Sequence, residues 1–285
     1  MMEVREQLQR AKSQFRTLEI SEVDAEHLFA HILGLSRMDL HNSVTVDKAL
    51  SHFEEQRDIE ENFAALCARR ASGEPLQYIT GVAYFHNLTL EVGPGVLIPR
   101  PETELLVESI LNHLKSSNGP TSVIDLGAGS GAIALAIAAQ VPNAHVIAVE
   151  KDPAALVWLR KNCESADAEV RIVAEDVATA LMGVKADLVV ANPPYIPTGQ
   201  ELPKDVASHE PHVALFGGTD GMEIPRVFID AAARLLKPGG LFVIEHGEEQ
   251  AESITQKLSE NFIMIKNHDD LNQRPRWASA QRSSA

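Results

Sequence analysis

The sequence predicts an α/β fold in which a mostly parallel sheet is flanked by helices and preceded by a small helical bundle. The chain has 285 residues, of which 45% are hydrophobic, and this favours two domains with well-formed cores. From residue 122 onward, short apolar strand-like runs alternate with helical patterns, which is typical of a parallel sheet covered by helices. Before residue 75 the periodic segments are helical and contain no strand candidate.

Helices fill the first 75 residues. Ser21 can cap a helix that Gly34 ends, and its apolar positions repeat at helical spacing: Ala25, Leu28, Phe29, Ile32 and Leu33. A second long helix is predicted over residues 47–71, ending before Gly73. Together these helices make a small bundle, which either stabilises the rest of the chain or offers a docking surface. The residues alone leave the two roles open.

A hairpin is predicted between the bundle and the α/β region, because residues 84–92 alternate in character. A helix then begins at Pro101. Proline suits the first turn of a helix, and Glu102 and Glu104 suit its dipole. The predicted organisation is a helical domain at 1–75, a hairpin linker at 76–95 and an α/β domain at 96–285.

A glycine-rich turn joins the first apolar strand of the α/β domain to an apolar helix. Residues 123–131 read Val-Ile-Asp-Leu-Gly-Ala-Gly-Ser-Gly and lead into the run 132–139. Such a turn brings backbone N–H groups and a helix N-terminus against a ligand. Glu150 ends the next apolar run, where an acid commonly binds ribose hydroxyls, and Asp176 follows the third run. These strand ends predict a site for an adenosine-type cofactor.

The glycines alone leave two cofactor classes open. Gly127-x-Gly129-x-x-Ala132 satisfies the loose dinucleotide fingerprint of nicotinamide enzymes. Asp125-x-Gly127-x-Gly129-x-Gly131 more closely resembles the first motif of S-adenosylmethionine-dependent methyltransferases, in which no pyrophosphate needs a cradle. The next segment favours the methyltransferase, because such an enzyme must position an acceptor nitrogen and a hydride-transfer enzyme has no obvious need to.

The segment Asn192-Pro193-Pro194-Tyr195 follows the strand-like run 186–191 and suits the binding of a planar NH2 group. The Asn192 oxygen can accept one N–H, and the prolines leave carbonyls free on a backbone of fixed φ. Tyr195 can stack on a flat group or close the pocket. Asn-Pro also starts ordinary turns, so the segment indicates a binding function only in combination with the cofactor motif.

Residues from about 73 to 281 resemble the family of N5-glutamine methyltransferases that modify peptide chain release factors. Ile-Pro-Arg-Pro-Glu-Thr at 98–103 combined with Asn-Pro-Pro-Tyr at 192–195 is highly specific for that family. Further matching stretches lie at residues 73–81, 96–104, 125–131, 210–211, 214–215, 217–221 and 244–247. Before residue 73 the likeness is limited to length and helical character.

The resemblance implies a class I methyltransferase fold: Rossmann-like, with a mostly parallel seven-stranded sheet ending in an antiparallel hairpin from 262–265 and 276–280. It implies methyl transfer from S-adenosylmethionine to the glutamine N5 of the release-factor Gly-Gly-Gln motif, with S-adenosylhomocysteine as product and no metal. The implied cofactor-binding residues are Gly127, Ala128, Gly129, Ser130, Gly131, Glu150, Asp176, Val177 and Asn192. The implied substrate-binding and catalytic residues are Asn192, Pro193, Pro194 and Tyr195.

Two positions depart from the family's pattern. Members often carry Asp where Glu150 stands, and the longer side chain should still reach the ribose at some loss of rotamer freedom. Many members carry a large aromatic residue where Val177 stands, so adenine stacking is expected to be weaker or supplied elsewhere. The resemblance also favours docking as the role of residues 1–75.

Charge and composition narrow the partners and the location. The net charge of −15 and the absence of a Lys/Arg block argue against binding driven by nucleic-acid phosphates. Cys67 and Cys163 lack metal-ligand spacing and suit a reducing compartment. The N-terminus has no apolar signal core, and residues 132–141 are too few to span a bilayer. We therefore expect a cytoplasmic protein without membrane contact, and a monomer, since no apolar heptad run requires a dimer.

Two other functions compete with glutamine methylation. An adenine-N6 methyltransferase acting on nucleic acid would present the same two amino hydrogens to Asn192. Such an enzyme must also unstack its base and hold phosphates, which the acidic balance disfavours. A cofactor-binding adaptor without activity is disfavoured by the intact acceptor segment.

Three further features have less specific interpretations. Residues 196–221 have no clear period and are predicted to be a lid or a substrate-contacting loop. Glu245 and His246 follow the fifth strand and are interpreted as structural. Arg100, between two prolines, suggests a clamp for a carboxylate or for the bundle, and the sequence does not fix its partner.

Overall fold

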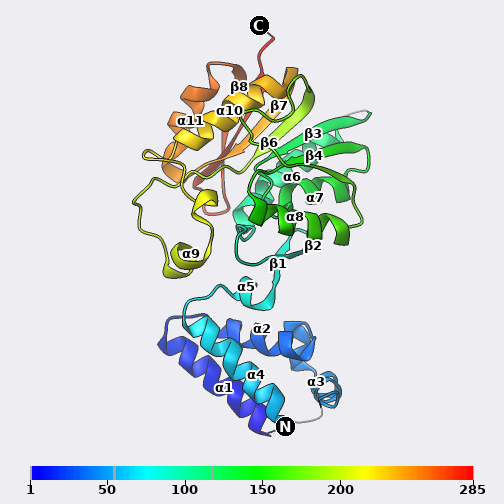
Figure 1. The fold of residues 1–285 in the computed structure, drawn as a ribbon, viewed down its shortest axis with the longest axis vertical. Helices are drawn as coiled ribbons and strands as arrows, with labels where there is room; N and C mark the ends of the chain where they lie inside the picture. The colour runs from blue at the N-terminus through cyan, green and yellow to red at the C-terminus, as the bar shows by residue number, and fades with distance from the viewer. Residues whose placement is uncertain (1, 54–55, 117–118, 285) are drawn as a thin grey trace. The chain divides into compact units, whose positions relative to one another are not determined.

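A computed structural model describes residues 2–53, 56–116 and 119–284 and divides the chain into two units (Figure 1). The first unit comprises Met1–Gly81 with Pro203–His209, and the second comprises Val82–Leu202 with Glu210–Ala285. Within the described ranges, no helix combines the length and the apolar character needed to cross a membrane.

Helices build the first unit around a core that includes Phe15, Leu28 and Ile59. Ser21 Oγ accepts a hydrogen bond from Val23 N at 3.3 Å, and Gly34 ends the helix with a φ of 64°. Both predicted ends of this helix are therefore confirmed. In chain order the helices are α1 (Met2–Thr17), α2 (Glu22–Leu33), α3 (Ser43–Leu50), α4 (Gln56–Ala71) and α5 (Leu76–Thr80), with α9 (Lys204–His209) grouped with them.

The prediction of a single helix over residues 47–71 is wrong, because the helical structure is interrupted between α3 and α4. Ser51 Oγ donates to the Lys48 carbonyl at 2.7 Å, and Phe53 N donates to the Leu50 carbonyl at 3.2 Å in a turn. Serine side chains compete in this way with helical backbone bonds. Phe53 then packs against the core of the unit. Residues 54–55 of the predicted helix lie outside the described residues.

The second unit opens with the predicted hairpin, which is confirmed as β1 (Val82–Phe85) paired antiparallel with β2 (Leu88–Glu91). The helix α6 (Pro101–Lys115) follows, with proline in its first turn as predicted. Proline suits that position because the first N–H groups of a helix have no intrahelical partner.

Seven strands form the sheet of the second unit in the order β5-β4-β3-β6-β7-β9-β8. The first five in that order run parallel, whereas β9 lies antiparallel between β7 and β8. The predicted mostly parallel sheet and its terminal antiparallel hairpin are confirmed. The strands are β3 (Thr121–Leu126), β4 (Ala144–Val149), β5 (Val170–Val173), β6 (Ala186–Ala191), β7 (Leu236–Glu245), β8 (Phe262–Asp269) and β9 (Pro275–Arg282).

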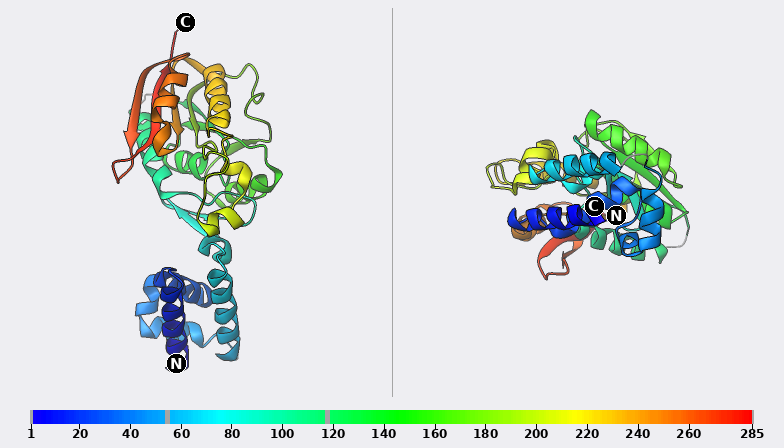
Figure 2. Two further views of the ribbon diagram at one scale, coloured as in Figure 1. Left: turned by 90° about the vertical axis from the view of Figure 1, so that its left-hand side faces the viewer. Right: turned by 90° about the horizontal axis from the view of Figure 1, so that it is seen from below.

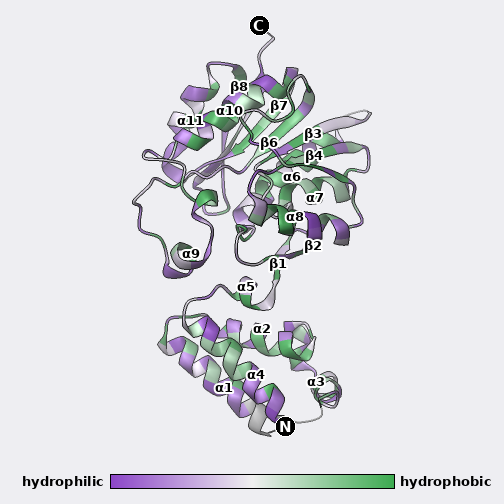
Figure 3. Cartoon of the chain, in the orientation of Figure 1, coloured by the Kyte–Doolittle hydropathy of each residue, from purple (hydrophilic) through white to green (hydrophobic). Residues whose placement is uncertain are grey.

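Helices cover both faces of this sheet (Figures 1 and 2). Residues of β3 contribute to two hydrophobic cores on opposite faces of the sheet. Val123 packs with one set of helices, and Ile124 and Leu126 pack with the other. A strand buried on both faces reads as a continuous apolar run, and the central strands are correspondingly hydrophobic in Figure 3. One face carries α6, α7 (Ala132–Gln140) and α8 (Pro153–Ser165), and the other carries α10 (Glu223–Leu235) and α11 (Ala251–Leu258).

The segment 196–221 is more ordered than its composition predicts. It contains α9 and a 3-10 turn at His212–Ala214. Its ends are tied together, because Ile196 N donates to the Leu215 carbonyl at 2.9 Å and Gln250 Nε2 donates to the carbonyls of Tyr195 and Gly221 at 2.8 and 3.1 Å. These bonds fix the base of the loop where it leaves the sheet. Its role as a lid stays a prediction.

Candidate active site

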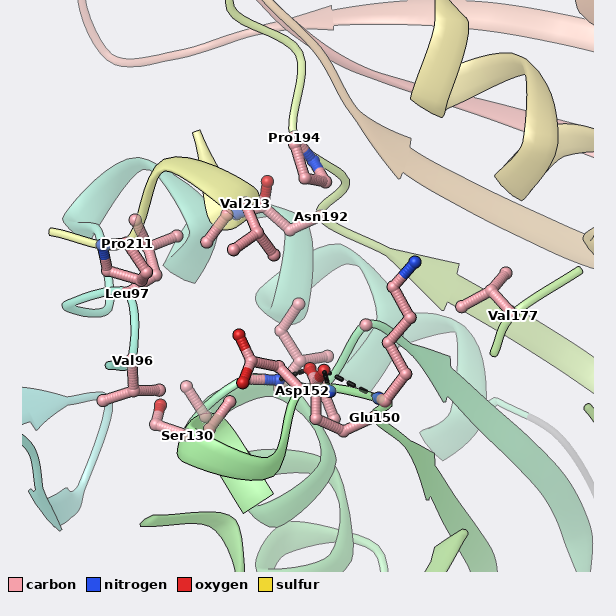
Figure 4. Close-up of a pocket in the computed structure, with 18 of the residues that line it drawn as sticks. Val96, Leu97, Ser130, Glu150, Asp152, Val177, Asn192, Pro194, Pro211 and Val213 are labelled. Carbon is pink, nitrogen blue, oxygen red and sulfur yellow. Dashed lines mark hydrogen bonds between the residues drawn. The ribbon is translucent and has the colours of Figure 1, made fainter. Parts of the chain in front are cut away.

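A cavity of about 320 Å³ lies in the second unit where β3, β4 and β6 end. Figure 4 shows Asn192 and Pro194 on one side of the cavity and Ser130 and Glu150 on the other. The predicted positions Gly131, Pro193 and Tyr195 are not part of the lining. The other predicted site residues all line it: Gly127, Ala128, Gly129, Ser130, Glu150, Asp176, Val177, Asn192 and Pro194.

Glycine is required for different structural reasons at the positions that follow β3. All three have positive φ, at 70° for Gly127, 56° for Gly129 and 86° for Gly131, where side chains with a Cβ are disfavoured. A Cβ on Gly131 would lie 2.7 Å from Leu159 Cδ1, so packing behind the loop excludes it. A Cβ on Gly129 would meet only Val96 Cγ2, at 4.0 Å. Gly129 therefore keeps the loop conformation and leaves open space toward the cavity.

Glu150 is held rigidly after β4 by backbone donors. Its Oε2 accepts from Gly129 N at 2.9 Å, and its Oε1 accepts from Lys151 N and Asp152 N, both at 2.8 Å. The residue is only 9% exposed. A carboxylate has about four acceptor positions, so one remains after these three bonds. The acid thus ties the glycine loop to β4 and keeps one acceptor position for a ligand hydroxyl.

Asp176 and Val177 form the part of the lining that follows β5. Hydrogen bonds from Ala178 N at 2.9 Å and from Lys151 Nζ at 3.0 Å hold the pKa of Asp176 below its ordinary value. Val177 is buried and contributes an apolar wall. Further apolar lining comes from Phe85 and Phe228, which are both aromatic.

Asp125 lies beneath the glycine loop and is almost fully buried, at 1% exposure. Its Oδ2 accepts from Ala134 N at 3.1 Å, whereas its Oδ1 has no hydrogen-bond partner among the described residues. Burial raises the pKa of this carboxyl to about 7. Asp125 therefore supports the start of α7 from inside the protein.

Asn192 follows β6 directly and is held by a chain of hydrogen bonds. Asn192 Nδ2 donates to Thr103 Oγ1 at 3.2 Å, and Thr103 Oγ1 donates to Glu245 Oε2 at 2.6 Å. The Tyr195 hydroxyl donates to Glu245 Oε1 at 3.3 Å. Burial raises the pKa of Tyr195 above its ordinary value. In this arrangement the hydroxyl of Tyr195 is anchored to Glu245 and the Asn192 side chain reaches the cavity.

Arg100 has a defined partner within the second unit. Its Nη2 donates to Glu210 Oε1 at 2.6 Å, and Ile98 N donates to Glu210 Oε2 at 3.1 Å. Glu210 is 4% exposed and precedes Pro211, which lines the cavity with Arg100. The pair therefore ties the segment before α6 to the segment that returns after α9. The carboxylate partner that the sequence left open is a residue of the protein itself.

Comparison with known proteins places the chain in a family. A family model described as "Methyltransferase small domain" matches residues 101–209, and one described as "PrmC N-terminal domain" matches residues 6–81. A Streptomyces coelicolor protein named release factor glutamine methyltransferase is 40% identical over 91% of this chain and 90% of its own length. A Mycolicibacterium smegmatis protein of the same name is 43% identical over the same shares. The chain belongs to the release factor glutamine methyltransferase family.

Solved structures agree with this assignment in fold. The T. thermophilus 16S rRNA N2 G1207 methyltransferase, solved with AdoMet and guanosine, has a TM-score of 0.53 at 26% identity over 70% of this chain and 49% of that one. A methyltransferase from Pyrococcus furiosus also has a TM-score of 0.53, at 18% identity over 70% of this chain and 90% of that one. The predicted class I methyltransferase fold and the predicted family are confirmed, and the chain is a methyltransferase that uses S-adenosylmethionine.

Two contributors to the site, Thr103 and Glu245, were not identified as such from the sequence. Both lie in stretches that resemble the family, but they are 142 positions apart and meet only in the folded protein. Glu245 is 2% exposed and was interpreted as structural. Its bonds to Thr103 and Tyr195 show that it supports the acceptor segment directly. The available signal was an acidic residue at the end of a buried strand beside β6.

Proposed function

We propose that this protein transfers a methyl group from S-adenosylmethionine to the side-chain N5 of the glutamine in the Gly-Gly-Gln motif of peptide chain release factors. The relatives that cover most of the chain carry the name release factor glutamine methyltransferase. The observation that carries the proposal is the position of Asn192. Asn192 lines the cavity, and its Nδ2 donates a hydrogen bond to Thr103. Among the described residues, none donates a hydrogen bond to its Oδ1.

The residues around the cavity fit the cofactor. Gly127, Ala128, Gly129, Ser130 and Gly131 supply a loop with space for a ligand at Gly129. The further residues that would hold it are Glu150, Asp176, Val177 and Asn192. The lining carries the carboxyl groups of Glu150, Asp152 and Asp176 together with the cations of Lys151 and Arg100, and Lys151 is paired with Asp176. When bound, S-adenosylmethionine supplies the activated methyl group on its sulfonium, and S-adenosylhomocysteine remains.

The acceptor segment would act by position. A carboxamide nitrogen is a weak nucleophile because its lone pair is delocalised, and an acidic side chain cannot usefully deprotonate it beforehand. Asn192 Oδ1 and the Pro193 carbonyl accept its two hydrogens, while Pro194 and Tyr195 complete the segment that binds the glutamine. Orientation of this kind is worth at most about 7–11 kcal/mol in the best intramolecular reactions. We assign no general base, since the proton can leave after transfer.

The remaining features of the proposal concern partners and organisation. Residues 1–75 would bind the release factor, and residues 96–285 would catalyse the methyl transfer. Residues 76–95 would link these two domains. The protein would act as a monomer in the cytoplasm, without a metal and without direct contact to nucleic acid. The net charge of −15 supports the last point, because phosphate binding needs clustered cations.

Methyl transfer from labelled S-adenosylmethionine tests the proposal. Release factors, duplex nucleic acid and single-stranded nucleic acid are offered in parallel, and mass spectrometry locates the modified residue. We expect one methyl on the glutamine of the Gly-Gly-Gln loop and none on a release factor with alanine at that position. Label on adenine with the release factor untouched would replace the proposal with the nucleic-acid alternative, which the relatives do not favour.

Asn192→Ala tests the acceptor role. The variant should lose turnover by about 100-fold or more, as when a single oriented hydrogen-bonding group is removed from an active site, while cofactor affinity measured by calorimetry falls only modestly. Asn267→Ala is a matched control, because Asn267 is exposed on β8 and bonds Thr255 outside the cavity. Near-normal turnover in Asn192→Ala would show that the positional mechanism is wrong.

A further inference from the structure

The hydrogen-bond chain behind Asn192 has only one polarity compatible with an ionised Glu245. A threonine hydroxyl has one proton to donate, whereas a carboxylate only accepts. The 2.6 Å separation between Thr103 Oγ1 and Glu245 Oε2 is typical of a charge-assisted O–H···O⁻ bond. The Thr103 proton is therefore directed at Glu245, and Thr103 Oγ1 can only accept from the third member of the chain.

This polarity decides which end of the Asn192 amide faces the cavity. The oxygen and nitrogen of an asparagine amide are similar in shape, so their assignment depends on the surrounding hydrogen bonds. Asn192 Nδ2 lies 3.2 Å from Thr103 Oγ1 and donates to it. The reversed amide would place Oδ1 against the lone pairs of Thr103 Oγ1 and would present Nδ2 to the substrate. A donor there would repel the NH2 group that must be bound.

We propose that Thr103 and Glu245 are positioning residues that set the amide polarity of Asn192, so that Oδ1 faces the acceptor nitrogen. The inference rests on the proposed function in assigning the substrate amide to Asn192. The pairing of β6 with β7 supplies the geometry: Ala191 lies opposite Ile244, Asn192 directly follows β6, and Glu245 is the next and last residue of β7. Thr103, in the first turn of α6, closes the gap between them.

The charge of Glu245 controls this chain. Its carboxyl faces Thr103 and Glu102 from α6, Tyr195 from the segment after β6, and Arg276 from β9. Burial is the largest influence and raises its pKa to about 7, and Glu102 acts in the same direction. A protonated Glu245 can donate to Thr103, which frees the Thr103 proton for Asn192 Oδ1 and stabilises the reversed amide. Turnover should therefore rise as the pH rises through the titration of Glu245.

Kinetics of three variants test the inference. Thr103→Val keeps the shape and removes the hydroxyl, and should lower kcat by about 10- to 100-fold, the range between losing a hydrogen bond and misplacing a polar group in an active site. Cofactor affinity should change by less than about threefold, which is under 0.7 kcal/mol. Thr103→Ser restores the hydroxyl and should recover most of kcat. Thr255→Val is the matched control, because the Thr255 hydroxyl bonds the Ala251 carbonyl on α11, outside the cavity.

Glu245→Gln separates positioning from folding. Glutamine does not titrate, so the kcat of the variant should lose the rise between pH 6 and 8 that is expected for the unmodified protein. An unchanged kcat in Thr103→Val, or the same pH profile in Glu245→Gln as in the unmodified protein, would overturn the inference. So would a loss of kcat in Thr103→Val that Thr103→Ser does not recover.

NMR gives a readout that needs no release factor. The side-chain amide signals of Asn192 should shift between pH 6 and 8 in the unmodified protein and stay constant in Glu245→Gln. If release factors are not methylated but these signals shift, the proposed function fails and the hydrogen-bond polarity stands. If release factors are methylated but the signals do not respond to pH or to Glu245→Gln, the inference fails and the proposed function stands.

Discussion

Replacing the buried acid Glu245 by glutamine should change the way stability depends on pH. Glu245 is 2% exposed, and burial raises its pKa from an ordinary 4.5 to about 7. A carboxyl with a raised folded-state pKa favours the native state fully below its unfolded pKa, where it is protonated in both states. That contribution is lost as the pH rises from the unfolded pKa through 7, because over this range the unfolded carboxyl releases its proton while the native one retains it.

The size of the effect follows from the two pKa values. With pKa 4.5 unfolded and about 7 folded, the free energy of unfolding falls by about 2.5 kcal/mol between pH 5 and 8 through this one group. Asp125 acts in the same direction, since burial raises its pKa to about 7. His246 acts in the opposite direction below pH 6.5, since burial lowers its pKa. Both contributions cancel when the variant is compared with the unmodified protein at each pH.

Urea unfolding at pH 5, 6, 7 and 8, at constant ionic strength and without cofactor, measures the difference. The fluorescence of Trp158 and Trp277 reports on the second unit specifically, because the chain has two tryptophans and both lie there. Relative to the unmodified protein, Glu245→Gln should gain about 2.5 kcal/mol from pH 5 to pH 8. The exposed Glu252→Gln on α11 controls for the loss of one carboxylate. A difference that stays constant across this range would refute the reasoning.

Three further substitutions test the supports of the cavity. Gly129→Val should weaken cofactor binding at least about tenfold in calorimetry, because it adds backbone strain at a positive φ and a side chain toward the cavity. A cofactor affinity within twofold of normal would contradict this prediction. Gly131→Ala should instead lower the free energy of unfolding in urea by about 1–3 kcal/mol, because its Cβ would lie 2.7 Å from Leu159; unchanged stability would show that the neighbour yields freely. Arg100→Ala should lower the free energy of unfolding by about 3 kcal/mol in the same assay, because it leaves the buried carboxylate of Glu210 without its cation. A decrease below about 1 kcal/mol would mean that water replaces the arginine.

The fold was predictable where the residues act locally or repeat along an element. The strands of the second unit are apolar runs because both sheet faces are covered. Ser21 and Gly34 mark helix ends through their own backbone and side-chain bonding. The break between α3 and α4 was missed because Ser51 is compatible with either a helix or a turn, and the packing of Phe53 decides. Tertiary contacts of that kind carry no periodic signal.

The site divides along the same line. The glycine loop, Glu150 and Asn192 each follow a strand, so a parallel sheet necessarily brings them to one edge. Their supports come from distant parts of the chain. Glu210 reaches Arg100 across 110 positions. No spacing rule relates such residues, and only the strand order and the path of the loop make them neighbours.

The register of β6 and β7 explains why the acceptor and its support belong to one structural unit. Ala191 pairs with Ile244, so the residues that follow are Asn192, just after β6, and Glu245, the last residue of β7. A shift of the register by one residue would turn the Glu245 side chain to the opposite face of the sheet and leave Thr103 without its acceptor. The sheet that builds the core thus also determines which amide atom Asn192 presents to a substrate. Substitutions that disturb this pairing should therefore impair turnover before they impair cofactor binding at β4, which is separated from β6 by β3.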